Sequence, residues 1–364
     1  MKTKRRLLFR TAVCILVMAV CYGGFVFLLS GGPDLTFSAA AEEAGNITSG
    51  TLNYSDGAVY EGEILYGRIR NGTGTLTWST GEVYAGTWEN DVQSGKGRLD
   101  FPGLGVYEGD FYNGKREGNG TFTWIYEGEP GEGDPVSFAG EWADDKIGAH
   151  GTLVLAGIGT YEGDFAKQQR SGTGTFTWLN GDVYTGAWAQ DAIQGQGVLA
   201  MNDGTKLEGD FARGVVRKGT ITYAVSGGTV TRDIANGKAQ DAVKIAYSDG
   251  TVVSGKVKGD EFTGNVTILY ASGDTYTGTI KNGLKDGKGT YTWAGGAHYT
   301  GEWVNDKMSG KGKYFYYRDE SASYLDGTFR NGVPDGQLIY VAETKLRYQT
   351  SWSNGSCTSI YYKK

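Results

Sequence analysis

The chain has 364 residues, of which 61 are glycine, only 5 are proline and 13% are aromatic. This composition departs from that of an ordinary globular protein and indicates β-structure that is rich in turns. The first 30 residues carry five basic residues and no acidic one, so the remaining chain has a net charge of −11 (−6 minus +5). An acidic body repels phosphate backbones and anionic head groups, which excludes nucleic acid and disfavours acidic lipids as partners.

An uncharged segment near the amino terminus is typical of a membrane anchor. Residues 11–29 carry no charge, and a Gly-Gly-Pro sequence follows at residues 31–33. As a helix, these 19 residues would span about 28 Å, close to the hydrocarbon thickness of a bilayer. The basic residues before the segment hold the amino end in the cytoplasm. We therefore expect residues 1–30 to form a cytoplasmic stub and one transmembrane signal anchor, with the remaining chain extracytoplasmic.

Two other interpretations of this segment stay open. A cleaved signal peptide would need a small-residue site, and the candidate at residues 38–40 lies well beyond Leu29. A lipoprotein signal at Cys21 would need a small residue before it, where the chain has Val20. The signal anchor is the favoured interpretation, and residues 31–49, which hold little that could pack, are expected to form a flexible spacer.

Short motifs recur along the rest of the chain. The sequence YEGDF occurs at Tyr107 and Tyr161, and LEGDF occurs at Leu207. The period is about 23 residues, within the range of a single supersecondary unit in a repeat protein. Units begin at Tyr60, Tyr84, Tyr107, Phe138, Tyr161, Tyr184, Leu207, near Thr231 in a degenerate unit, and at Val253, Tyr276, Tyr299 and Leu325.

Each unit has the pattern of a β-hairpin. In the unit that begins with Tyr161 at position 1, Phe165 is at position 5, Gly174 at position 14 and Trp178 at position 18. Positions of one parity hold rings and glycines, and positions of the other parity hold Glu, Asp, Thr and Lys, which predicts two strands with one apolar and one polar face. The glycines are expected to leave slots in which rings lie flat. A single hairpin is not stable, so each unit must pack on its neighbours.

This period and the Y-x-G-x-W/F…G-x-G pattern resemble the MORN (membrane occupation and recognition nexus) family over residues 60–347, about four-fifths of the chain. The resemblance implies an all-β fold, an elongated twisted antiparallel sheet of about twelve hairpins. It also implies a scaffold, tether or dimerisation module, and some family members are linked to phospholipid. We expect a capping half-repeat at residues 50–59 and a partial repeat that caps the sheet at residues 348–364.

Two departures from the repeat are informative. The degenerate unit at residues 231–252 lacks the position-1 Tyr and the G-x-G pair, which indicates either a seam near residues 225–260 or a drifted unit that is still a hairpin. An insertion at residues 125–137 carries four carboxylates and two prolines. We expect a solvated loop there; a contact to a partner or to calcium is the alternative, although the spacing matches no calcium loop.

The sequence offers little with which to build a catalytic centre. His150 and His298 lie six units apart, roughly 60 Å at two strands per unit, so they cannot share a metal or a proton. The remaining body candidate is Cys357, a partly buried thiol or a residue of an intermolecular disulfide. Carboxylates at positions 2 and 4, such as Glu162 and Asp164, recur in unit after unit, whereas a catalytic pair would be special. We therefore expect no enzyme activity, no cofactor and no metal.

The leading hypothesis is a membrane-anchored scaffold that presents an extended β-surface to a protein partner. A cell-wall or carbohydrate-binding protein is the alternative, because rows of Tyr and Trp suit stacking on sugars; a lipid-associated tether is a further one, and a homodimer stays open. The candidate binding residues are the aromatic side chains of the repeat face: Tyr107, Trp124, Tyr161, Trp178, Tyr184, Trp188, Tyr276, Trp293, Tyr299 and Trp303.

Overall fold

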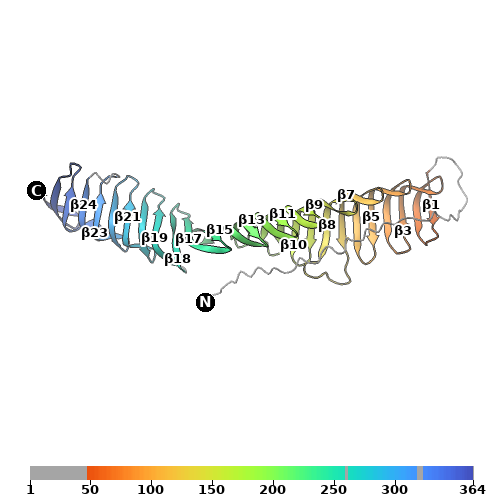
Figure 1. The fold of residues 1–364 in the computed structure, drawn as a ribbon, viewed down its shortest axis with the longest axis horizontal. Helices are drawn as coiled ribbons and strands as arrows, with labels where there is room; N and C mark the ends of the chain where they lie inside the picture. The colour runs from red at the N-terminus through yellow and green to blue at the C-terminus, as the bar shows by residue number, and fades with distance from the viewer. Residues whose placement is uncertain (1–46, 259–260, 318–322, 364) are drawn as a thin grey trace. The chain divides into compact units, whose positions relative to one another are not determined.

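The computed structural model describes residues 47–258, 261–317 and 323–363, and every regular element in these ranges is a β-strand. The chain divides into two compact units (Figure 1): unit 1 is Met1–Asp203 with Glu208–Val216, and unit 2 is Gly204–Leu207 with Arg217–Lys364. The predicted anchor at residues 11–29 lies outside the described residues. Within them, no helix has the length and apolar character needed to cross a membrane.

In unit 1, consecutive strands pair antiparallel from β1 to β13. The strands are β1 (Ile47–Asn53), β2 (Val59–Leu65), β3 (Ile69–Thr77), β4 (Val83–Glu89), β5 (Val92–Phe101), β6 (Gly105–Tyr112), β7 (Lys115–Trp124), β8 (Pro135–Ala143), β9 (Lys146–Leu155), β10 (Gly159–Ala166), β11 (Gln169–Trp178), β12 (Val183–Ala189) and β13 (Ala192–Ala200). The division between the units falls within β14 (Lys206–Ala212) and β15 (Val215–Val225).

Unit 2 repeats the same arrangement from β15 onward. Its strands are β16 (Gly228–Ala235), β17 (Lys238–Tyr247), β18 (Val252–Lys258), β19 (Glu261–Leu269), β20 (Thr275–Lys281), β21 (Leu284–Thr292), β22 (His298–Val304), β23 (Lys307–Phe315), β24 (Tyr324–Arg330), β25 (Val333–Pro334), β26 (Gly336–Val341), β27 (Arg347–Ser353) and β28 (Ser356–Lys363). The predicted all-β array of antiparallel hairpins is thus confirmed for the described residues.

In each hairpin with an aromatic residue at position 1, the ring lies in a slot made by glycine. Tyr161 is fully buried, and a Cβ added to Gly174 on the facing strand would overlap its ring. The phenol hydroxyl reaches past Gly163 and donates to the Asp164 carbonyl oxygen at 2.9 Å. The predicted glycine slots are therefore present, and the ring on one strand lies over the glycine of the neighbouring strand in the same hairpin.

Short turns set the register of the hairpins. Asn90 (φ 52°) and Asp91 (φ 69°) connect β4 to β5 with both residues in the left-handed region. Two-residue turns of this kind match the right-handed twist of the paired strands. Near each turn one strand bulges, as between Gly163 and Phe165. In the bulge of this hairpin the Asp164 carboxylate accepts a bond from the Thr173 amide at 2.8 Å.

Neighbouring hairpins pack together through the side chain at position 5. The Trp188 ring meets the Tyr161 ring of the preceding hairpin at 5.1 Å and 75°, an edge-to-face contact. The same contact joins Tyr184 to Phe211 at 5.2 Å and Tyr276 to Trp303 at 5.6 Å. The core is therefore a single layer of interlocked rings on one face of the sheet, which we term the inner face.

The degenerate unit is a hairpin, formed by β16 and β17. Val230 takes the position-1 place and is buried, one residue before Thr231. Ile234 and Val243 are buried beside it, so aliphatic side chains replace the aromatic layer here. The insertion forms the connection between β7 and β8, where the Tyr126 hydroxyl donates to the Pro135 carbonyl oxygen at 2.9 Å.

Candidate functional site

The structure places most of the candidate binding residues in the core. Tyr107, Tyr161, Tyr184, Trp188, Tyr276, Tyr299 and Trp303 are all buried, so their rings serve the packing of the array. Trp124, Trp178 and Trp293 are half-buried. Each of these three packs one side against the ring two residues before it, as Trp178 does on Phe176 at 4.7 Å. Of the predicted inner-face set, these three rings have surface left for a ligand.

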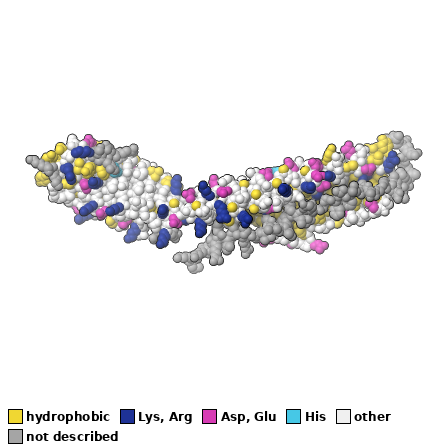
Figure 2. Space-filling view, in the orientation of Figure 1, with side chains coloured by type: hydrophobic (Ala, Val, Ile, Leu, Met, Phe, Trp, Pro, Cys, Tyr) yellow, Lys and Arg dark blue, Asp and Glu magenta, His cyan; other side chains and the backbone are white. Residues whose placement is uncertain are grey.

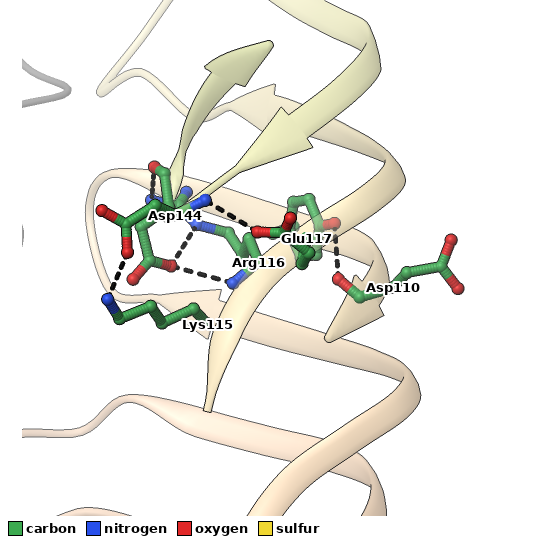
Figure 3. Close-up of polar contacts among 7 residues, drawn as sticks. Asp110, Lys115, Arg116, Glu117 and Asp144 are labelled. Carbon is green, nitrogen blue, oxygen red and sulfur yellow. Dashed lines mark hydrogen bonds and ion pairs between the residues drawn. The ribbon is translucent and has the colours of Figure 1, made fainter. Parts of the chain in front are cut away.

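A cation lies beneath the position-5 Trp at several junctions between hairpins. The Arg116 guanidinium lies 4.6 Å from the centre of the Trp142 ring, and its Nε lies 3.2 Å from the Asp145 carboxylate. The Arg116 Nη2 donates to the Asp145 carbonyl oxygen at 2.7 Å. Figure 3 shows this junction, where Lys115 and Glu117 flank Arg116 and contact Asp144 from either side. The ion pair, the contact between cation and ring, and the bond to the turn carbonyl thus hold the two hairpins together.

The same junction recurs with the same residue types. Arg70, Arg170 and Lys285 face position 5 of their own hairpins, and each lies over the Trp of the next hairpin and pairs with the Asp of its turn. The sets are Arg70 with Trp88 and Asp91, Arg116 with Trp142 and Asp145, Arg170 with Trp188 and Asp191, and Lys285 with Trp303 and Asp306. We refer to these as the cation–Trp–Asp staples.

Junctions without the cation have a different composition. Ile193 occupies the place of the cation, the next position-5 ring is Phe211, and the second turn residue is Gly214. Position 5 alternates between Trp and Phe from Trp88 to Phe211, so unit 1 contains three stapled pairs of hairpins. This alternation was not predicted from the sequence, although the recurring spacing of 21 residues between Arg and Asp carries the signal.

The opposite side of the sheet, the outer face, carries the polar side chains. Threonine hydroxyls pair across strands there, as Thr175 with Thr185 at 3.1 Å and Thr290 with Thr300 at 2.9 Å. The pKa of Asp164 is lowered, first by the bond from the Thr173 amide and then by His150, whose Nδ1 lies 3.1 Å from the carboxylate. These side chains contribute little to the core and are open to a partner.

The two histidines and the cysteine of the described part of the chain lie on three different strands, β9, β22 and β28. His150 is exposed on the outer face, whereas His298 is buried and stacked on Phe315 at 4.3 Å. Cys357 is exposed and carries a free thiol. Among the described residues, no group of three or more His, Cys, Asp or Glu side chains is placed to hold a metal ion. The surface of the array is therefore the candidate functional site.

Comparison with known proteins supports the repeat assignment. The MORN repeat family model matches residues 60–83, 84–105, 107–125, 161–183, 184–206, 276–298, 299–318 and 326–337. The TCP domain of Drosophila melanogaster SAS-4, solved in complex with a proline-rich motif of Ana2, aligns at 11% identity over 53% of this chain and 84% of that chain, with a TM-score of 0.26.

Two curated relatives share part of the array. Alsin of Rattus norvegicus is 31% identical over 121 residues, which cover 26% of this chain and 7% of Alsin. MORN repeat-containing protein 3 of Xenopus laevis is 36% identical over 73 residues, which cover 20% of this chain and 30% of that protein. The chain thus spans less than a third of either relative. These matches support the resemblance of the array to MORN repeats in the eight matched segments.

Proposed function

We propose that the protein is a non-catalytic scaffold whose outer face docks a protein partner. The observation that carries the proposal is that the two faces of the sheet have different side chains and different burial. The inner face buries its rings in glycine slots, while the outer face presents exposed side chains such as Glu162 and Lys281 on a backbone held by continuous ladders. A rigid repeat surface of this kind suits an extended protein partner.

A pull-down with outer-face variants tests this proposal. The full-length chain should retain a specific protein partner, and reversing the charge of Glu162 and Lys281 should weaken that retention at least tenfold. As a control, Leu179→Ser changes an exposed side chain at an inter-hairpin turn and should leave retention unchanged. Failure to recover a specific partner from the native host would count against the scaffold role.

We further propose that residues 11–29 anchor the chain in a membrane with the repeats extracytoplasmic. The support is the uncharged length of the segment and the basic residues before it. Protease treatment of intact cells that express a carboxy-terminally tagged chain tests the topology. A full-mass, membrane-bound tag should be removed by external protease. A protected tag would invert the topology, and a shortened, released product would mean cleavage.

The half-buried tryptophans favour carbohydrate binding as a second candidate function. Trp124, Trp178 and Trp293 each expose part of a ring that the hairpin core does not cover, and open aromatic rings stack on sugar faces. Sedimentation with isolated wall polysaccharide tests this function. A Trp124→Ala, Trp178→Ala variant should stay in the supernatant while the wild type pellets. A wild type that does not pellet removes the candidate.

A further inference from the structure

The two units differ sharply in charge. Residues 47–203 and 208–216 of unit 1 hold 24 acidic and 10 basic residues, a net charge of −14, whereas residues 204–207 and 217–364 of unit 2 hold 14 acidic and 20 basic residues, a net charge of +6. The net charge of the whole chain hides this division. The expectation that the body as a whole repels anions therefore does not hold for unit 2.

The outer face of unit 2 changes character in its last hairpins. Position 17 faces outward, and elsewhere in the array it can be a small polar residue such as Thr177. In the hairpin of β22 and β23 and in that of β24 and β26, the same position holds Phe315 and Val341. At position 15, Ile339 likewise takes the place that Thr290 has two hairpins earlier. Large apolar side chains thus replace threonine on this part of the outer face.

The register brings these apolar side chains side by side. Phe315 lies opposite Tyr324, which lies opposite Val341, and the Phe315 and Tyr324 rings are 5.3 Å apart. In the next row β26 adds Ile339, and β28 adds Tyr361 two strands further on. Phe315 and Val341 are buried, Tyr324 and Ile339 are half-buried, and Tyr361 is 67% exposed. We term these five residues the outer patch.

Basic side chains surround the outer patch. Lys311 and Lys313 are exposed on β23, and Arg347 is exposed on β27. The Lys313 Nζ lies 5.2 Å from the centre of the Tyr324 ring and 3.6 Å from the Asp326 carboxylate. Asp326 is the one carboxylate at an outer position of β23, β24, β26 and β27, strands that the structure describes in full. Figure 2 shows hydrophobic side chains gathered near the end of unit 2 with Lys and Arg side chains beside them.

We propose that the outer patch binds an acidic segment of a protein partner, with a large apolar side chain of that segment seated over the patch. The proposal rests on the scaffold function and names the part of the outer face and the chemistry of the partner. An apolar centre with a charged rim is the anatomy of a protein interface. Charge complementarity sets the sign, because the basic rim attracts carboxylates, whereas the exposed Glu61 and Glu162 on the outer face of unit 1 repel them.

Nucleic acid and a membrane surface fit the outer patch less well. Bases of a single strand stack on open rings, whereas Phe315 is only 8% exposed and Ile339 and Val341 are aliphatic. A membrane-surface element inserts apolar side chains into the lipid, whereas Phe315 and Val341 are buried at the sheet surface. A protein segment can bring its own apolar side chain to such a surface.

Selection from a library of short random peptides, with the full-length chain as bait, tests the chemistry of the occupant. The retained peptides should be enriched in Asp and Glu together with at least one large apolar residue. Their affinity should fall as salt is raised from about 50 mM to about 500 mM, because the exposed charges of the rim are screened. A retained pool without acidic enrichment would overturn the proposal.

Two charge variants locate the site. Lys311→Glu with Arg347→Glu reverses two exposed charges of the rim and should weaken the selected peptides about tenfold or more. Lys244→Glu with Lys256→Glu makes the same change in net charge on the outer face of β17 and β18, roughly 24 Å or more from β23. This control should leave the affinity unchanged. Equal losses in both variants would show an effect of net charge alone and would contradict the proposal.

Two further variants test the apolar centre. Ile339→Thr with Tyr361→Ser should weaken the selected peptides by a similar factor, and the sheet tolerates threonine at position 15, as at Thr290. Leu269→Ser with Tyr112→Ser removes the same kinds of side chain from two other exposed places and should leave the affinity unchanged. Circular dichroism checks that each variant is folded. Peptides that bind the Ile339→Thr, Tyr361→Ser variant as well as the wild type would rule out the outer patch as their site.

A pull-down from the native host separates this proposal from the scaffold function. If the wild type and the Lys311→Glu, Arg347→Glu variant retain the same partner equally, the scaffold function stands and the outer patch is not its site. If no partner is retained but acidic peptides bind the outer patch, the scaffold function fails and the peptide site stands. If no acidic peptide is selected, yet phosphatidylserine vesicles or polyuridine bind through Lys311 and Arg347, the occupant is lipid or nucleic acid and the proposal is wrong.

Discussion

At the scale of single residues, the staples explain why a few turns carry aspartate where glycine would fit the backbone. Asp191 has φ 62°, a conformation that favours glycine. Its carboxylate accepts bonds from the Arg170 amide at 3.0 Å and from Arg170 Nε at 3.1 Å. The guanidinium is buried above Trp188. The carboxylate therefore compensates a buried charge, which outweighs the strain of the turn.

We predict that Asp191→Gly lowers the free energy of unfolding by about 3 kcal/mol, because it leaves a buried guanidinium without its carboxylate. The double variant Arg170→Ile, Asp191→Gly reproduces the residue types of the unstapled junction at Ile193 and Gly214. It should recover most of the loss, since no buried charge remains. Urea unfolding measures both variants, and a double variant less stable than Asp191→Gly would contradict this account.

The buried tyrosines give the stability an alkaline limit. Burial raises the pKa of Tyr184 from 10.0 to about 12, and it raises the pKa of Tyr60, Tyr161, Tyr276 and Tyr299 to the same value. Between pH 10 and 12 the unfolded chain loses phenol protons that the folded chain still holds, so the free energy of the unfolded state falls relative to that of the folded state. The contribution of the buried tyrosines to the free energy of unfolding is fully present below pH 10 and is lost as the pH rises above it.

We expect the urea midpoint to be insensitive to phenol ionisation below pH 10 and to fall steadily from pH 10 to 12. Tyr184→Phe removes one ionisable group, along with its bond to the Ala187 carbonyl oxygen. It should lower the midpoint at neutral pH and make the alkaline decline less steep. A decline of unchanged slope in Tyr184→Phe would show that Tyr184 does not contribute to it.

At the scale of the hairpin, the central constraint is the match between a ring and a glycine. Gly174→Ala would force a methyl group into the Tyr161 ring, and we predict a loss of about 2 kcal/mol or more. Gly295→Ala is the matched control, because its Cβ would meet no atom within 4 Å and its backbone is unstrained. Thermal unfolding of both variants compares them. A Gly174→Ala variant as stable as Gly295→Ala would contradict the claim that the Tyr161 ring requires glycine at this position.

The hairpin is also the scale at which sequence was most informative. Alternation along each strand and the period of about 23 residues are local patterns, so they predicted the strands, the two faces and the slots. The staples were not predicted, because the repeat pattern allows either Trp or Phe at position 5. It therefore does not distinguish the hairpin of Trp188 from that of Phe211. Burial of Tyr161 and Tyr276 depends on a ring from the next hairpin, which the pattern of one unit does not contain.

At the scale of the whole chain, the packing of each hairpin on its neighbours makes stability a sum of local terms. The stapled junctions are the strong terms, and the aliphatic hairpin of β16 and β17, which lacks the ring layer, is a weak one. We predict that amides of Val230 and Val243 exchange faster with solvent than those of Tyr161 and Phe176 in hydrogen-exchange measurements. Equal protection in the two regions would contradict this gradient.

The central claim is that the outer face is the binding face and the inner face is the core. Photo-crosslinking in the native host tests it most directly, with a photoreactive amino acid placed at Glu162 or Lys281 on the outer face and at Trp178 or Trp293 on the inner face. The account predicts specific adducts from the outer positions and none from the inner ones. Adducts confined to Trp178 and Trp293 would contradict it and would place the binding surface on the aromatic side of the sheet.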